Sequence, residues 1–171
     1  MLKRIFPFNL FKNTKDLDEY TNEIPMDDSD FECDDIVYNT YDKILEKCNY
    51  GDNIEKLNEH ERILFITQIV EGEVNNGGFS QFFYNSSGNF SNEIVEAFTQ
   101  IGALKTAEIC KGALTVFPDK APTNRAERQD LLEKLDCDDA LEKYDEAFYE
   151  YEDNLLELNT TYIEKYSEFF K

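Results

Sequence analysis

Residues 71–85 form the stretch EGEVNNGGFSQFFYN, whose composition we expect to tolerate substitution least of any part of the chain. Its residues 75–78, Asn-Asn-Gly-Gly, interrupt a helical pattern with the two residue types that best tolerate a positive φ. Phe79, Phe82 and Phe83 then recur at i, i+3 and i+4, so a short helix leaving this break presents one aromatic face. The stretch therefore predicts a tight corner between two helices, filled by phenylalanine side chains.

Apolar residues spaced by three and four predict helices on both sides of this corner. One helix is expected from Asp34 to about Cys48, ended by Gly51. Asn58 with Glu61 resembles a capping box and opens the helix that leads into the corner. Later helices are expected over residues 91–101, 103–116 and 123–135, where capping residues, Gly102 and two prolines set the limits.

The last segment of the chain carries the clearest helical pattern. Its apolar residues step by three and four, and they are Leu141, Tyr144, Phe148, Tyr151, Leu155, Leu158, Tyr162, Tyr166 and Phe169. This pattern predicts one long amphipathic C-terminal helix. No stretch alternates in the manner of a β-strand, so the predicted fold class is all-α: an irregular bundle of six or seven helices that ends in this long helix.

Length and composition indicate a single folded unit. A chain of 171 residues suits one domain with a full core, and 41% hydrophobic residues argue against wholesale disorder. Residues 1–33 have little helical period and become strongly acidic in their second half. We therefore expect a partly ordered N-terminal arm over residues 1–33 and one helical domain over residues 34–171.

The formal net charge of −20 is concentrated at the two ends of the chain. Residues 1–15 carry +4, residues 16–35 carry −10, residues 36–126 carry −4 and residues 127–171 carry −10. Such a field repels nucleic acids and anionic membranes and attracts basic partners, although solubility alone also accounts for an acidic composition. The charge argues against direct binding of DNA or RNA.

The acidic side chains of the last segment are expected to face a partner. Residues 138–168 hold 11 acidic and 2 basic side chains, which on one helix gives one net charge per ~5 Å. Duplex DNA carries one charge per ~1.7 Å of its axis, so a second acidic element must lie alongside for this helix to imitate DNA. The predicted partner-binding residues are Glu142, Asp145, Glu146, Glu150, Asp153, Glu157 and Glu164.

The sequence predicts no catalytic residues, no metal site and no cofactor. Its four cysteines show no C-x-x-C spacing, and His60 is the only histidine that could join them. There is no P-loop, no H-E-x-x-H and no G-x-G-x-x-G after a strand. Only Glu71 and Glu73 beside Asn75 and Asn76 form a plausible polar cluster for an enzyme cleft.

We expect neither a secretory leader nor a membrane span in this sequence. Residues 1–11 are apolar only in short runs that Pro7 and Asn9 break, and no cleavage site follows. No stretch approaches the length of a membrane span. We expect a cytoplasmic protein with free thiols.

The corner also carries a resemblance to a known family. The block from Val74 to Asn85, followed by EAFTQIGA at residues 96–103, resembles a bacterial family of small acidic helical proteins that includes a dimeric DNA mimic. The resemblance covers residues 36–117 and implies a helical fold, a homodimer and action as a DNA mimic. Its signature residues here are Glu73, Asn75, Asn76, Gly77, Gly78, Phe79, Gln81, Phe82, Phe83 and Asn85.

These observations lead to one main hypothesis and three alternatives. The main hypothesis is a non-enzymatic acidic protein whose residues 16–35 and 127–168 occupy the basic DNA-contacting surface of a DNA-binding protein or transcription regulator. One alternative is an immunity-type module that neutralises a toxin through the aromatic corner. The others are an enzyme that uses the polar cluster and a domain of unassigned function.

Overall fold

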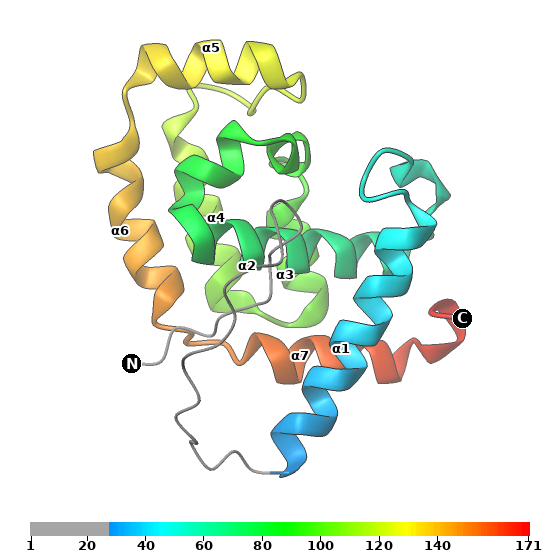
Figure 1. Ribbon diagram of the computed structural model, residues 1–171. Coiled ribbons are helices and arrows are strands. Elements are labelled where there is room, and N and C mark those ends of the chain that lie inside the picture. The colour runs from blue at the N-terminus through cyan, green and yellow to red at the C-terminus, as the bar shows by residue number, and fades with distance from the viewer. Residues whose placement is uncertain (1–27) are drawn as a thin grey trace, which may run out of the picture.

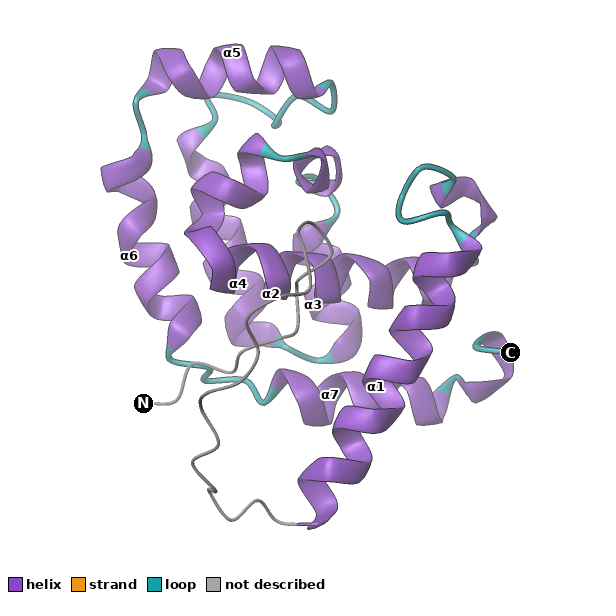
Figure 2. Cartoon of the chain, viewed as in Figure 1, coloured by secondary structure: helices purple, strands orange, loops and turns teal. Residues whose placement is uncertain are grey.

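The computed structural model describes residues 28–171, which contain α-helices and short 3-10 turns but no strand (Figures 1 and 2). The helices are α1 Asp28–Lys47, α2 Glu59–Tyr84, α3 Ile94–Ile101, α4 Leu104–Ala113, α5 Arg125–Leu135, α6 Asp138–Tyr149 and α7 Leu155–Lys165. The 3-10 turns are η1 Ile54–Lys56, η2 Ser86–Phe90, η3 Leu114–Val116 and η4 Ser167–Phe169. The predicted all-α irregular bundle is confirmed. Residues 1–27, most of the expected arm, lie outside the described part, and α1 begins six residues before the expected start.

Helix α2 is the centre of the bundle. It contacts α1, α3, α5 and α6, and Figure 1 shows these helices arranged around it. Phe65 in its first half and Phe82 in its second half are both fully buried, so apolar side chains meet the core along its whole length. A helix that is apolar on most of its faces is stable only inside such a shell of other helices.

Three helices begin with the same sequence pattern, Asn-x-x-Glu. Asn58 forms the predicted capping box, because its side chain accepts from the Glu61 N–H while the Glu61 carboxylate accepts from the Asn58 N–H. Asn124 accepts in the same way from Glu127 at the start of α5, and Asn154 from Glu157 at the start of α7. Each N-cap satisfies a backbone donor that the first turn leaves free.

The prediction of one long C-terminal helix is wrong. Helix α6 ends at Tyr149 and α7 begins at Leu155, and Tyr151 between them has a left-handed φ of 48°. Helix α6 packs on α2 and α4, whereas α7 packs on α1 and α3, and the two run in different directions in Figure 1. Phe148 precedes the break and Leu155 follows it, and both side chains are buried in the core. The spacing of apolar residues therefore continues across the break.

The C-terminal residues fold back onto the start of α2. The Asn58 side chain donates to the main-chain carbonyl of Phe169 at 2.8 Å, and the His60 ring stacks on Tyr166 with centroids 4.1 Å apart. The Tyr162 hydroxyl lies 2.8 Å from His60 Nδ1. His60 therefore helps to hold the C-terminal residues against the start of α2.

No helix among residues 28–171 has the length and apolar character to cross a bilayer.

Candidate functional site

The predicted corner between two helices is confirmed, and it lies inside α2. Gly77 and Gly78 have non-helical backbone angles, and Gly78 has φ 73° and ψ −178°. This conformation is open essentially to glycine alone. A Cβ at Gly78 would overlap the carboxylate of Asp145, which belongs to α6, and a Cβ at Gly77 would overlap the side chain of Gln81. Both the backbone and the close packing therefore require glycine at Gly78.

The Glu73 carboxylate ties the two halves of α2 together across the corner. Its Oε2 accepts from Gln81 Nε2 at 2.5 Å and from Asn85 Nδ2 at 2.9 Å, and its Oε1 accepts from Ser87 Oγ at 2.9 Å. Gln81 Oε1 in turn accepts from Asn76 Nδ2 at 2.9 Å. Four polar residues of the signature, Glu73, Asn76, Gln81 and Asn85, thus form one hydrogen-bonded brace, a role that the sequence spacing alone did not reveal.

The phenylalanines of the corner are core residues. Phe79, Phe82 and Phe83 are all 0% exposed. Phe79 meets Phe148 of α6 edge-on at 5.9 Å, and Phe83 meets Phe117 in the same way at 5.1 Å. These three rings are therefore not accessible to a toxin, as the alternative hypothesis of an immunity-type module required.

The polar cluster proposed for an enzyme cleft separates into two internal networks. Glu71 is only 2% exposed, and its Oε1 accepts from the Tyr151 hydroxyl at 2.9 Å. Asn75 Nδ2 donates to that same hydroxyl at 2.5 Å. Glu73 and Asn76 instead belong to the brace around Gln81. The four side chains do not converge on an open pocket.

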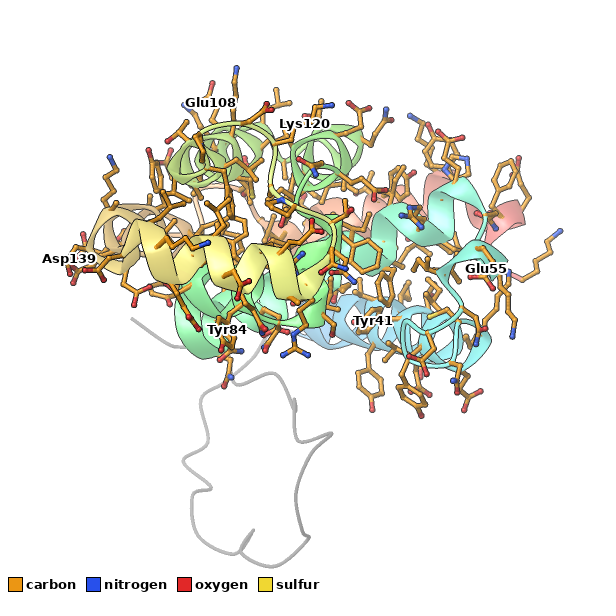
Figure 3. All side chains as sticks on the ribbon, turned by 90° about the horizontal axis from the view of Figure 1, so that it is seen from above. Tyr41, Glu55, Tyr84, Glu108, Lys120 and Asp139 are labelled. Atoms are coloured by element: carbon orange, nitrogen blue, oxygen red, sulfur yellow. The ribbon has the colours of Figure 1, made fainter. Side chains whose placement is uncertain are left out.

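Exposed carboxylates gather on the outer side of α6, a region called here the acidic α6 surface. Its members are Asp136, Asp138, Asp139, Glu142, Glu146 and Glu150, all of them exposed. The salt bridges among the described side chains, those of residues 36–171, lie elsewhere, at Lys47–Glu61, Arg62–Glu93 and Lys105–Glu108. Lys143 is the one basic residue within the span 136–150, and its Nζ lies 4.8 Å from the centre of the Tyr144 ring. Figure 3 shows Asp139 at the edge of the molecule.

Two of the predicted partner-binding carboxylates instead cap helices from across the fold. Asp145 Oδ1 accepts from the Phe79 N–H at 2.7 Å, at the start of the second half of α2. Burial raises the pKa of Asp145, and the nearby charges of Glu142 and Asp138 add to this, while the hydrogen bond from Phe79 opposes it. Asp153 Oδ2 accepts from the Thr106 N–H at 2.8 Å in the first turn of α4.

The remaining predicted residues do not share one helix face. Glu142, Glu146 and Glu150 belong to the acidic α6 surface, whereas Glu157 and Glu164 are exposed on α7, beyond the break. Along the acidic α6 surface, six carboxylates and Lys143 span ~20 Å, which is one net charge per ~4 Å. This density is below that of duplex DNA, at one charge per ~1.7 Å.

Arg128 of α5 is a buried cation that sequence reasoning missed. It is 0% exposed and donates to the main-chain carbonyls of Phe83 at 2.5 Å, Asn85 at 2.7 Å and Pro122 at 2.7 Å. Burial lowers its pKa, and the charge of Arg125 adds to the effect. The carbonyls of Phe83 and Asn85 lie more than 40 residues away in the chain, so no spacing of side chains marks this site.

The buried thiols and the carboxylates form no evident metal centre. Cys48, Cys110 and Cys137 are free and buried, and burial raises the pKa of each thiol. Among residues 36–171, whose side chains the structure describes, no group of three or more His, Cys, Asp and Glu side chains is placed to hold a metal ion.

The sequence was compared with models of known protein families. A family model described as DMP19-like protein matches residues 55–166, about two thirds of the chain. The chain belongs to the DMP19-like family. The matched region of this DMP19-like protein contains the corner and the acidic α6 surface, but neither α1 nor the acidic residues 16–35. No curated protein and no solved structure matches the chain.

Proposed function

We propose that this DMP19-like protein is a non-enzymatic binding protein that occupies the basic DNA-contacting surface of a DNA-binding protein or transcription regulator. The observation that carries the proposal is the acidic α6 surface. Its span contains six exposed carboxylates and a single lysine, and these carboxylates form no salt bridge with the side chains of residues 36–171. The surface lies inside the family match, and the family resemblance to a DNA mimic supports the same function. We also propose that it acts in the bacterial cytoplasm, where such partners are expected.

The charge density of one acidic α6 surface is too low to match that of duplex DNA, so more than one copy of the surface is needed. One net charge per ~4 Å is less than half the density of duplex DNA. Two copies of the acidic α6 surface side by side would bring the density to one charge per ~2 Å, which is close to DNA. We therefore propose a homodimer as the binding form, with both α6 helices on one face.

The proposal is tested by capture of partners from a nuclease-treated bacterial lysate. The wild-type protein should retain basic DNA-binding proteins at 50 mM salt and release them at 500 mM, because exposed charges are screened as the Debye length falls from ~14 Å to ~4 Å. The variant Glu142→Gln/Glu146→Gln/Glu150→Gln should lose these partners. A captured protein should also be displaced from its DNA by the wild-type chain in a mobility-shift assay.

The matched control removes the same number of charges from the other side of the helix break. Glu157, Glu164 and Glu168 are exposed, so the triple glutamine variant at these positions changes the net charge equally without touching α6. It should retain the partners. If both triple variants capture the same proteins, and if those proteins persist at high salt, the DNA-mimic proposal is wrong and the alternative of an immunity-type interaction module gains support.

A further inference from the structure

The corner inside α2 contains an asparagine followed by a glycine, Asn76–Gly77, and no other Asn-Gly pair occurs in the chain. Both residues are exposed, and the Asn76 side chain donates from Nδ2 to Gln81 Oε1 at 2.9 Å. An asparagine amide in front of a glycine is chemically labile, because glycine has no side chain to keep its main-chain nitrogen away from the preceding residue. The corner therefore places a reactive pair at the surface of the molecule.

The backbone at this position allows the two reacting groups to approach each other. Regular helical geometry stops at Gly77, whose φ is −158° and whose ψ is 28°. Turning the Asn76–Gly77 peptide group at such a break disrupts fewer main-chain hydrogen bonds than it would in the middle of a helix. The amide carbon of Asn76 therefore reaches the main-chain nitrogen of Gly77 without unfolding of the whole helix.

We propose that Asn76 is a site of spontaneous deamidation in the folded protein, and that its hydrogen bond to Gln81 limits the rate. The main-chain nitrogen of Gly77 loses its proton to hydroxide and attacks Cγ of Asn76. A Cγ–N bond forms, the Cγ–Nδ2 bond breaks, and Nδ2 leaves as ammonia after taking a proton from water. Water then opens the five-membered succinimide at either carbonyl, which leaves aspartate or isoaspartate at position 76. Water is the only co-reactant, and hydroxide is regenerated.

The hydrogen bonds of the brace have a direction, and the product of the reaction opposes it. Asn76 donates to Gln81 Oε1, and Gln81 Nε2 donates to Glu73 Oε2 at 2.5 Å. A carboxylate at position 76 has acceptors only. If Gln81 keeps its orientation, its Oε1 faces the new carboxylate, and if its amide group reverses, Oε1 faces the carboxylate of Glu73. Two oxygens meet in either case, so the aspartate product weakens the brace.

The isoaspartate product acts on the main chain as well. Its main chain runs through the former side chain, so that one extra carbon is inserted just before Gly77. Gly78 follows, and it packs so closely on the Asp145 carboxylate that a Cβ would overlap it. The next N–H, that of Phe79, donates to Asp145 Oδ1 at 2.7 Å. The inserted carbon displaces this contact between α2 and α6, so the corner loosens as a molecule ages.

Two other asparagines of the same corner serve as internal controls. Asn75 is half-buried, is followed by Asn76 instead of glycine, and donates to the Tyr151 hydroxyl at 2.5 Å. Asn85 is half-buried, is followed by Ser86, and donates to the brace at 2.9 Å. A side chain on the following residue and partial burial both hinder ring closure. The structure therefore predicts an order of reactivity in which Asn76 comes first.

The site is tested by incubating the full-length protein at pH 7 and pH 9 and mapping the products by tandem mass spectrometry, with an enzymatic assay for isoaspartate. Asn76 should gain one dalton and yield isoaspartate, faster at pH 9 because Gly77 must lose a proton, while Asn75 and Asn85 remain amides. The control Asn76→Gln should gain no mass, since glutamine must close a larger ring. The proposal is overturned if Asn76 stays intact over a period in which the urea-unfolded protein is converted, or if Asn75 or Asn85 reacts first.

The restraint by Gln81 is tested with two variants of the brace. Gln81→Ala frees the Asn76 amide and should raise the rate of deamidation several-fold. Ser87→Ala removes a different bond of the brace, from Ser87 Oγ to Glu73 Oε1, and should leave the rate as in wild type. Equal rates in Gln81→Ala and wild type would overturn the restraint.

The effect of the aspartate product is tested by urea unfolding of two variants. Asn76→Asp carries this product from the start, whereas Asn76→Ala loses the donor to Gln81 without adding an acceptor. Asn76→Asp should therefore unfold at the lower urea concentration. The reverse order would overturn the conclusion that deamidation opposes the direction of the brace. None of these measurements uses a DNA-binding protein, so they are independent of the DNA-mimic proposal.

Discussion

Gly78→Ala should be strongly destabilising, because two separate costs meet at this one position. The alanine must adopt φ 73° and ψ −178°, a region that costs ~1–3 kcal/mol for a residue with a Cβ. The new Cβ also displaces the Asp145 carboxylate, which leaves the Phe79 N–H without its acceptor at a further cost of ~1–3 kcal/mol. The expected loss is ~2–6 kcal/mol from a domain whose total stability is ~5–15 kcal/mol.

Gly102→Ala separates these two costs. Gly102 ends α3 with φ 88°, but a Cβ there would lie 3.7 Å from Leu158 Cδ2, an ordinary contact. Only the left-handed backbone is penalised, by ~1–2 kcal/mol. Asp145→Ala removes the obstacle beside Gly78, so the double variant Gly78→Ala/Asp145→Ala should be more stable than the sum of the two single changes predicts.

The assay is urea unfolding followed by circular dichroism at 222 nm, with the m-values compared to confirm that the unfolded state is unchanged. The reasoning is refuted if Gly78→Ala and Gly102→Ala cost the same within ~0.5 kcal/mol and the double variant is additive. In that case Asp145 yields freely, and the corner requires glycine for its backbone alone.

Three further outcomes are expected. Asp145→Asn keeps an acceptor for the Phe79 N–H but removes a carboxyl group whose pKa is raised in the folded state. The wild-type protein should therefore gain stability relative to this variant as the pH falls from 7 towards the ordinary carboxyl range, and it should lose that gain as the pH rises. Urea unfolding midpoints measured across this pH range test the prediction. Arg128→Met should lower the free energy of unfolding by at least ~3 kcal/mol, because several main-chain carbonyls lose a charged donor. Arg128→Lys should restore little of this stability, since lysine lacks the planar guanidinium group that donates several hydrogen bonds at once. Cys48, Cys110 and Cys137 should react with Ellman's reagent only as fast as the protein unfolds, whereas rapid labelling of all three in buffer would contradict their burial.

Local chemistry allowed much of the fold to be predicted from sequence. The Asn-Asn-Gly-Gly corner, the Asn58–Glu61 capping box and the end of α3 at Gly102 depend on residues close together in the chain, and all three are present. The break between α6 and α7 was missed because apolar spacing continues across it. The signal that marks it is Asn154 with Glu157, the same Asn-x-x-Glu pattern that opens α2 and α5.

The candidate site was harder to predict, since its assignment depends on contacts between distant segments. Helical position identifies Glu142 and Glu146 as outward-facing, and it treats Asp145 in the same way. Only the packing of α6 against the corner turns Asp145 towards the Phe79 N–H. Arg128 is a similar case, because the fold brings together its acceptors from the end of α2 and from the loop before α5.

The inward turn of Asp145 and Asp153 bears on how loss-of-function alleles of this protein should be interpreted. Neutralising either aspartate alters a helix cap, so any loss of activity would follow from a weakened fold and would say nothing about recognition. Glu142, Glu146 and Glu150 cap no helix of residues 28–171, which allows separation-of-function alleles that leave expression and melting temperature intact. A genetic screen scored together with protein abundance would sort the acidic residues into these two groups even before the partner is identified.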